Sequence, residues 1–301
     1  MSMSLKRSIL ALTVATGLAA FAVPAFAQDH SHDVETPPKQ KWSFSGPFGK
    51  FDRAQLQRGF KVYREVCSAC HSLELIAFRN LADQGGPEFS AAQAAVIAGE
   101  YKVPDAPNDA GEVVDRAARV ADYFPKPFPN ENAGRAANGG AYPPDLSVMA
   151  KARTYERGFP WFLIDIVTQF QEQGPDYVTA LLTGYAEKPA HFELPDGSAY
   201  NKYFPGNAIK MPPPLSDGRV EYTDGSPATT LQYAKDVTAF LMWTAEPKLE
   251  ARKRLGFQVM IFLLVFAGLL YFTKKKVWKQ VALHPEDLKP RDPAPGEYRP
   301  H

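Results

Sequence analysis

The sequence predicts a mainly α-helical exported domain with long irregular loops, followed by one transmembrane helix near the C-terminus. Short stretches with apolar residues at helical spacing alternate with segments rich in proline and glycine. The first 27 residues have the pattern of an export signal, and 19 uncharged residues lie at 255–273. We therefore expect a signal peptide, an exported domain, a membrane helix and a tail, at residues 1–27, 28–254, 255–273 and 274–301.

The N-terminal segment is interpreted as a cleaved signal peptide. Lys6 and Arg7 precede an apolar stretch at 9–23, and Ala25-Phe26-Ala27 offers small residues at the positions that signal peptidase reads. An uncleaved anchor is the alternative, but the proline before the small residues argues against it. We expect the mature chain to begin at Gln28 on the exported side.

The second apolar segment runs from Leu255 to Thr273, and as a helix it would be about 28 Å long, close to the ~30 Å of a bilayer core. Basic triplets at 252–254 and 274–276 bracket it, which disfavours a buried core helix. Because both flanks are positive, the signal peptide and not the count of basic residues predicts the orientation. We expect a single pass through a bacterial inner membrane, with 28–254 in the periplasm and 274–301 in the cytoplasm.

Cys67-Ser68-Ala69-Cys70-His71 matches the attachment site of a c-type haem. Each thiol can add across a haem vinyl group, and the histidine that follows can bind the iron. These are the only two cysteines, so a zinc site would lack its usual second pair of ligands. A thioredoxin-like redox pair is the alternative, but no βαβ pattern surrounds it. We predict a cytochrome c-like domain with one covalent haem, the chemistry of an electron carrier.

The predicted helices frame this motif. Asp52 is expected to cap the first one, with Gln55 as its capping-box partner, and the apolar positions then lead into the haem motif at spacings of four, three and four: Leu56, Phe60, Tyr63 and Cys67. Further helices are expected at 89–99, 146–153, 161–170 and 176–182, and from Ser226-Pro227 toward the membrane. The segments 103–144 and 186–227 are expected to be irregular loops.

Met211 is the predicted second axial ligand. It lies in a loop stiffened by Pro205 and by three prolines that follow the methionine, and a weak thioether donor needs such a restricted backbone. Met149 is possible, whereas the other methionines fall in the signal peptide, the membrane segment or a core helix face. His191 is the rival ligand and would give a lower potential. Arg135, in a glycine- and asparagine-rich segment, is the candidate partner for a haem propionate.

Charge gives little sign of a nucleic-acid partner, since the net charge is only +1. It is unevenly distributed, however. Residues 83–131 contain nine acidic residues against four basic ones, a net charge of −5. A solvated surface is the simplest interpretation, and a docking surface for a basic partner is the alternative hypothesis.

Together these features resemble the cytochrome c1 family, the haem c subunit of ubiquinol–cytochrome c reductase. The matching motifs stand in the family's order from about Trp42 to Lys279: Val62 to Ser72, Asp122 to Pro127, Arg135 to Ser147, Leu181 to Tyr185, Tyr203 to Met211, and Ala234 to Pro247. Two parts depart from the pattern. Residues 155–173 look longer and more apolar than in mitochondrial relatives, and no role is assigned to the tail after Gln280.

The resemblance implies thioether bonds at Cys67 and Cys70, axial ligation by His71 and Met211, and a propionate contact from Arg135. It also implies a membrane complex, expected to be dimeric, with cytochrome b and a Rieske iron–sulfur protein. The Rieske protein would reduce the haem, and a soluble c-type cytochrome would take the electron on. The chain offers no catalytic acid or base of its own. The alternatives are a stand-alone anchored carrier serving a terminal oxidase and, from another class, a haem-based sensor, which would need an open iron position.

Overall fold

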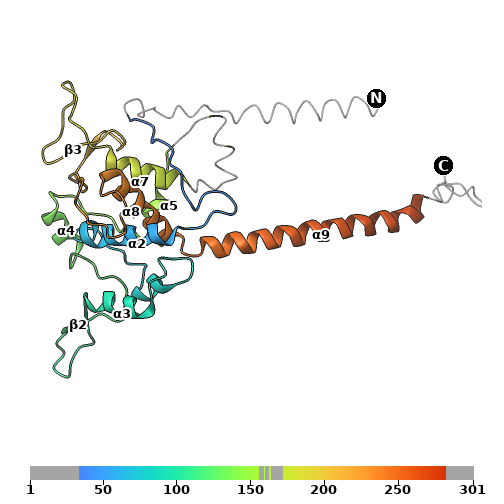
Figure 1. The fold of residues 1–301 in the computed structure, drawn as a ribbon, viewed down its shortest axis with the longest axis horizontal. Helices are drawn as coiled ribbons and strands as arrows, with labels where there is room; N and C mark the ends of the chain where they lie inside the picture. Colours follow the sequence, from blue (N-terminus) through green and yellow to red (C-terminus); the bar gives the residue numbers. More distant parts are fainter. Residues whose placement is uncertain (1–33, 156–158, 160–162, 164–171, 283–301) are drawn as a thin grey trace, which may run out of the picture.

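The computed structural model describes residues 34–155, 159, 163 and 172–282. They form a helical head from which one long helix projects (Figure 1). The strands are short, so the predicted fold class, mainly α with long irregular loops and a C-terminal apolar helix, is confirmed. The expected signal peptide, the expected helix at 161–170 except residue 163, and the end of the tail lie outside the described residues.

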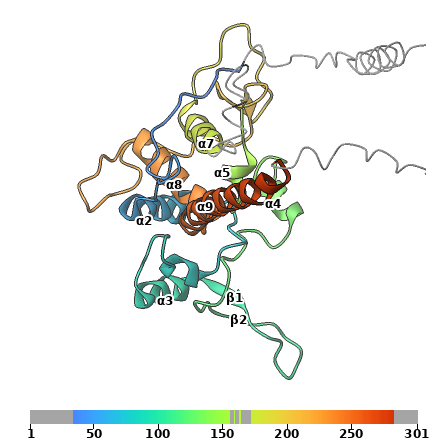
Figure 2. The same ribbon diagram turned by 90° about the vertical axis from the view of Figure 1, so that its right-hand side faces the viewer.

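The core of the head is a pair of helices, α2 (Arg53–Val62) and α8 (Thr230–Ala245), which lie side by side in Figures 1 and 2. Gly59 permits their close approach, because a Cβ there would lie 2.1 Å from the carbonyl oxygen of Asp236. Asp236 is fully buried and accepts hydrogen bonds from Arg58 and Gln55 on α2. The predicted cap is confirmed, since Asp52 accepts from the Gln55 backbone N–H, but the Gln55 side chain binds Asp236 instead of closing a capping box.

The first half of the head continues from α2 through a π-helical turn, η1 (Tyr63–Cys67), and a 3-10 helix, η2 (Phe78–Ala82), to α3 (Ala91–Gly99). The helix predicted at 89–99 is confirmed as α3, and Ser90 with Gln93 forms its capping box. The prediction of an irregular loop over 103–144 is partly wrong. It contains α4 (Glu131–Ala137), and β1 (Lys102–Pro104) pairs antiparallel with β2 (Asp115–Ala117).

The second half holds α5 (Met149–Ala152), α7 (Gln173–Thr183) and the small antiparallel pair β3 (Ala199–Tyr200) and β4 (Ala208–Ile209). The helices predicted at 146–153 and 176–182 are thereby confirmed, the first in shorter form. The predicted start of α8 is wrong: Thr229 caps it, three residues after Ser226, because its hydroxyl accepts the Gln232 backbone N–H. Leu231, in the first turn of α8, is exposed and takes no part in the apolar face that we expected for this helix.

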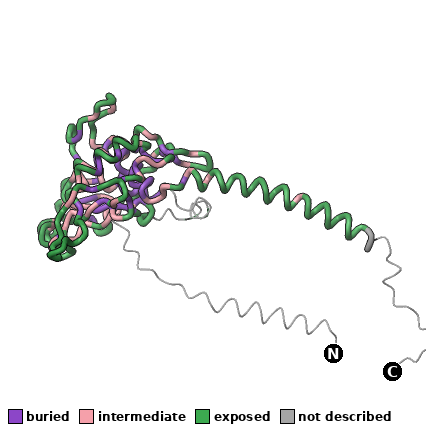
Figure 3. Tube along the Cα trace, turned by 90° about the horizontal axis from the view of Figure 1, so that it is seen from below, coloured by how far each residue is buried: buried purple, intermediate pink, exposed green. Residues whose placement is uncertain are grey.

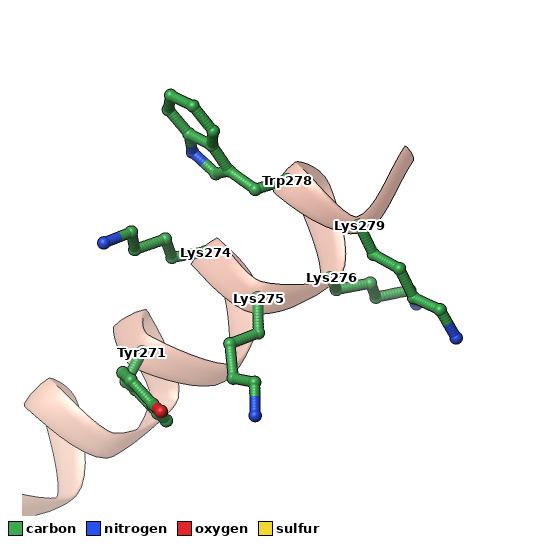
Figure 4. A pocket seen from close by; sticks show the side chains of 6 residues that line it. All are labelled: Tyr271, Lys274, Lys275, Lys276, Trp278 and Lys279. Atoms are coloured by element: carbon green, nitrogen blue, oxygen red, sulfur yellow. The ribbon is translucent and has the colours of Figure 1, made fainter. Parts of the chain in front are cut away.

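The long helix is α9 (Leu249–Ala282), which follows α8 after a break at Glu246 and Pro247. It is long and apolar enough to cross a membrane, and its large apolar side chains are exposed. Figure 3 shows the helix coloured almost entirely as exposed. Near its end, aromatic and lysine side chains point outward around the helix without enclosing a site (Figure 4): Tyr271, Lys274, Lys275, Lys276, Trp278 and Lys279. Such a band is typical of a membrane–water interface.

Candidate haem-binding site

The haem motif begins where α2 changes its hydrogen-bonding pattern. In η1, the backbone N–H of Ser68 binds the carbonyl of Tyr63 at 2.9 Å, a π-type turn that inserts an extra residue before Cys67. The Ser68 hydroxyl also donates to the carbonyl of Arg64 at 2.7 Å. These bonds tie the first cysteine to the end of a core helix.

A tight turn then carries the chain through the motif. The backbone N–H groups of Cys70 and His71 both donate to the carbonyl of Cys67, at 3.1 and 2.9 Å. The buried Tyr63 hydroxyl donates to the carbonyl of His71 at 3.2 Å. The two thiols and the imidazole therefore belong to one compact turn that is anchored on η1.

The His71 ring is oriented by a segment far along the chain. Its Nδ1 lies 2.8 Å from the carbonyl oxygen of Pro144, and because a carbonyl oxygen can only accept, Nδ1 carries the proton. Nε2 then holds a free lone pair, the form that binds a metal. Burial lowers the pKa of His71 and outweighs the opposing effects of the Pro144 bond and of the Asp145 charge, which favours the neutral ring.

Segment 142–147 is clamped onto the residues after His71. The Asp145 carboxylate accepts from the Ser72 hydroxyl at 2.9 Å and from the Glu74 backbone N–H at 2.8 Å. The backbone N–H of Leu146 donates to the carbonyl of Ser72, and the buried Ser147 hydroxyl accepts from the Leu75 N–H. This clamp holds the Pro144 carbonyl against the imidazole.

The thiols do not have the character of a redox pair. Burial, together with the charge of a Cys70 thiolate, raises the pKa of Cys67 to about 12. Catalytic Cys-x-x-Cys pairs need a lowered thiol pKa. The two cysteines form no disulfide with each other. With the raised pKa of Cys67, the arrangement suits attachment of a group better than thiol–disulfide exchange.

Met211 follows β4 in a loop with strong internal support. The buried Asn201 and Asn207 exchange hydrogen bonds across its base, and Asn207 adopts a left-handed backbone with φ of 57°. The Tyr185 hydroxyl donates to the carbonyl of Met211 at 3.1 Å. Met211 itself is half-buried. The backbone that presents the thioether is thus held from two sides.

The structure brings the predicted site residues together only in part. Arg135, on α4, donates to Glu131 and to the carbonyl of Gly140, and its side chain is half exposed. His191 is exposed in a loop. Among the described residues, no direct hydrogen bond joins Met211 or Arg135 to the Cys67–His71 turn.

Sequence reasoning named Tyr63 and segment 142–147 without giving them their roles. Asp145, Ser147 and Tyr185 hold ligand candidates in place through hydrogen bonds to partners distant in the sequence, and no local pattern signals that. The local signal that could have pointed to this support is the pair of polar residues Asp145 and Ser147, which directly follows two prolines.

A family comparison decides what this arrangement belongs to. The model of the Cytochrome C1 family matches residues 42–281, which include the haem motif, the clamp, the methionine loop and most of α9. The chain belongs to the cytochrome c1 family. The resemblance predicted from its motifs is therefore confirmed.

Curated relatives agree with the family match. The chain is 69% identical over 245 residues to "Cytochrome b/c1" of Bradyrhizobium diazoefficiens, with 81% of this chain and 36% of that protein covered. It is 50% identical over 277 residues to "Cytochrome c1" of Blastochloris viridis, with 91% and 96% covered. A mitochondrial cytochrome c1 of Arabidopsis thaliana is 44% identical over 252 residues, 84% of this chain and 75% of that one. The chain thus spans about a third of the Bradyrhizobium protein and nearly all of the Blastochloris protein.

Proposed function

We propose that this chain is the haem c electron-transfer subunit of a ubiquinol–cytochrome c reductase. The observation that carries the proposal is the Cys67–His71 turn, with its histidine fixed in the ligating tautomer, inside a chain that matches the cytochrome c1 family from residue 42 to 281. The bound haem would supply one-electron redox chemistry. The polypeptide would hold, orient and shield it.

In this proposal each site residue has a defined task. Cys67 and Cys70 would form the thioether links, and His71 would supply Nε2 as a ligand to the iron. Met211 would supply its sulfur as a second ligand, since its backbone is held by Tyr185 and its loop by Asn201 and Asn207. Arg135 would exchange its exposed contact with Glu131 for a haem propionate.

The partners follow from the relatives. The Bradyrhizobium relative is named for both cytochrome b and c1, and a Candida albicans relative, 45% identical over 246 residues, is named a catalytic subunit of the cytochrome b-c1 complex. We infer that this chain accepts electrons from a Rieske iron–sulfur protein beside cytochrome b and passes them to a soluble c-type cytochrome. The complex is proposed to be a dimer.

The test is a reduced-minus-oxidised visible spectrum of the tagged chain, purified in mild detergent from its own membranes. We expect b-type haem bands beside the c-type band, with both reduced by added quinol. A c-type band alone, from a sample that has kept its partner subunits through purification, would overturn the proposal in favour of the stand-alone carrier. Complete removal of haem by acidic acetone would contradict the thioether links, because covalent haem stays with the chain.

The proposed topology places the head in the periplasm and the C-terminus in the cytoplasm, with cleavage before Gln28. A fluorescent protein that matures only in the cytoplasm, fused after His301, should fluoresce in intact cells. Alkaline phosphatase fused at the same position should be inactive there. The reverse pair of results would invert the orientation of α9.

A further inference from the structure

An aromatic side chain of the head lies beside the first apolar turn of α9. Phe48 is 71% exposed, and its ring centroid is 5.4 Å from that of Phe257, in an edge-to-face contact. Phe257 is itself 51% exposed. Together the two rings form an apolar surface that starts on the head and continues onto the membrane-spanning helix.

The loop that carries Phe48 is tied to α9. The ammonium group of Lys253 donates to the carbonyl oxygens of Phe44, Gly46 and Gly49, at 2.5, 2.6 and 3.3 Å. The backbone N–H of Lys50 closes the loop onto the Ser43 carbonyl at 3.0 Å. Gly46 has a φ of 70°, a conformation that disfavours other residues. The depth of Phe48 along α9 is therefore set by the fold.

That depth coincides with one face of a bilayer. Phe257 is the third residue of the uncharged segment, about 3 Å inside its start. It precedes Trp278 in the aromatic band at the other end of α9 by 21 residues, or about 32 Å of helix, which is close to the ~30 Å of a bilayer core. A ring in contact with Phe257 must lie at the same level of the membrane.

The charges around the two rings suit lipid headgroups. Lys50, two residues after Phe48, and Arg254, about one turn before Phe257, are both exposed. An exposed aromatic ring flanked by exposed basic residues is the pattern of a surface that sits at the headgroup and acyl-chain boundary. A site for another protein chain would bury these cations and require acidic partners for them.

We propose that the loop 45–50 is a second membrane contact, which inserts Phe48 into the lipid interface on the side of the head. The loop and α9 then attach the head at two points and limit its tilt about the helix. This inference rests on α9 as a membrane span and not on the haem chemistry.

The test uses the full chain in its native complex, reconstituted into vesicles of phosphatidylcholine and phosphatidylglycerol. Phe48→Cys carries a nitroxide label, whose collisions with molecular oxygen and with a water-soluble nickel chelate are measured by electron paramagnetic resonance. Oxygen collects in lipid and the chelate in water. We expect the label at position 48 to collide mainly with oxygen, and the unmodified chain gives the background labelling.

Two matched variants calibrate the result. Phe262→Cys, exposed inside the apolar segment, should report lipid, and Val113→Cys, exposed in the β1–β2 hairpin away from α9 in Figure 1, should report water. A label at 48 that behaves like the one at 113 overturns the proposal, as does a label shielded from both reagents, which would mean a protein cover. If the Phe48→Cys variant does not assemble, Phe48→Trp is reconstituted with brominated lipids, which quench tryptophan fluorescence on contact. If the fluorescence added by the new tryptophan is not quenched, the proposal is overturned.

Discussion

A single carbonyl group prepares His71 for its proposed task. The Pro144 oxygen, 2.8 Å from Nδ1, selects the tautomer with a free Nε2, and burial lowers the pKa of the ring. The residues that position Pro144 matter as much as the histidine, because a ring free to rotate would not keep Nε2 directed at the iron. Asp145, with its bonds to Ser72 and Glu74, is the centre of that support.

Replacing Asp145 with asparagine tests this support. The amide keeps the size but loses a carboxylate oxygen that accepts two hydrogen bonds, so the free energy of unfolding should fall by about 1–3 kcal/mol. Denaturant unfolding of the detergent-solubilised protein, followed by the haem absorption, measures the change. Asp196→Asn, in an exposed loop, is the matched control and should change stability little. Equal stability of the two variants would mean that the clamp contributes nothing.

Met211→Leu tests the second ligand. Loss of the thioether should lower the reduction potential by on the order of 0.1 V or more, since axial ligands control a range of roughly 0.8 V. A potentiometric titration measures it, with Met149→Leu, in the short helix α5, as the control. An unchanged potential in Met211→Leu would exclude the assignment, and a shift in His191→Ala would favour the rival ligand.

The helix pair α2 and α8 supports the haem motif. The turn with both cysteines continues from α2, and α2 packs on α8 through the gap left by Gly59 and through the buried Asp236, to which Arg58 donates at 2.8 Å. Any change that separates α2 from α8 also moves Cys67. The close approach of these two helices is therefore a condition for the geometry of the haem motif.

Gly59→Ala should disrupt this contact. Its Cβ would meet the Asp236 carbonyl oxygen at 2.1 Å and the Phe240 Cβ at 2.7 Å, and such overpacking costs about 2–3 kcal/mol of unfolding free energy. Gly99→Ala is the control, because the space around Gly99 is open and its helix is equally short. The denaturant midpoint of Gly59→Ala should lie clearly below that of Gly99→Ala. Comparable midpoints would show that the helices can shift apart freely.

The junction between α8 and α9 should weaken in acid. Burial by itself raises the pKa of Glu246, but hydrogen bonds from Arg252 and Lys151 outweigh it, so the pKa lies below its ordinary value of 4.5. A lowered carboxyl pKa contributes stability that is present above about 4.5 and is lost as the pH falls through the folded value.

The corresponding measurement compares Glu246→Gln with the unaltered protein. At pH 7 the variant should melt at a lower temperature, and the gap should narrow as the pH falls below 4.5. A gap of constant size would show that ionised Glu246 does not stabilise the junction. The surface pair of Lys61 and Glu65 offers the control Glu65→Gln, since surface ion pairs contribute less than about 1 kcal/mol.

In the whole molecule, the apolar helix α9 and the acidic stretch 83–131 lie on different sides of the head. The acidic stretch 83–131 includes the β1–β2 hairpin, which projects from the head away from α9 (Figure 1). Arg116 pairs with Asp105 and Asp122, whereas Asp109, Glu112 and Asp115 are exposed. The hairpin therefore presents uncompensated negative charge far from the membrane helix.

If this side receives a basic acceptor, electron transfer to it should slow several-fold as salt rises from about 0.01 to 0.15 M, because the Debye length shortens from about 30 to 8 Å. Asp109→Asn with Asp115→Asn should reduce both the rate at low salt and its salt dependence. Glu193→Gln with Asp196→Asn, exposed acids of another loop, form the control pair. Stopped-flow oxidation of the reduced protein by the acceptor gives the electron-transfer rates. Rates that do not depend on salt would contradict the docking hypothesis.

Local patterns were sufficient to predict the helix that leads into the Cys67–His71 motif and the apolar helix near the C-terminus, and they carry the haem proposal. Each depends on residues a few positions apart, whose spacing is imposed by helical geometry or by the chemistry of attachment. Only the tertiary structure decided that the Pro144 carbonyl orients the His71 ring. The same holds for the hydrogen bond from Gln55 to Asp236 and for the ring contact between Phe48 and Phe257. Those partners lie 73, 181 and 209 positions apart, and periodicity carries no information over such separations, because packing of the whole head selects them.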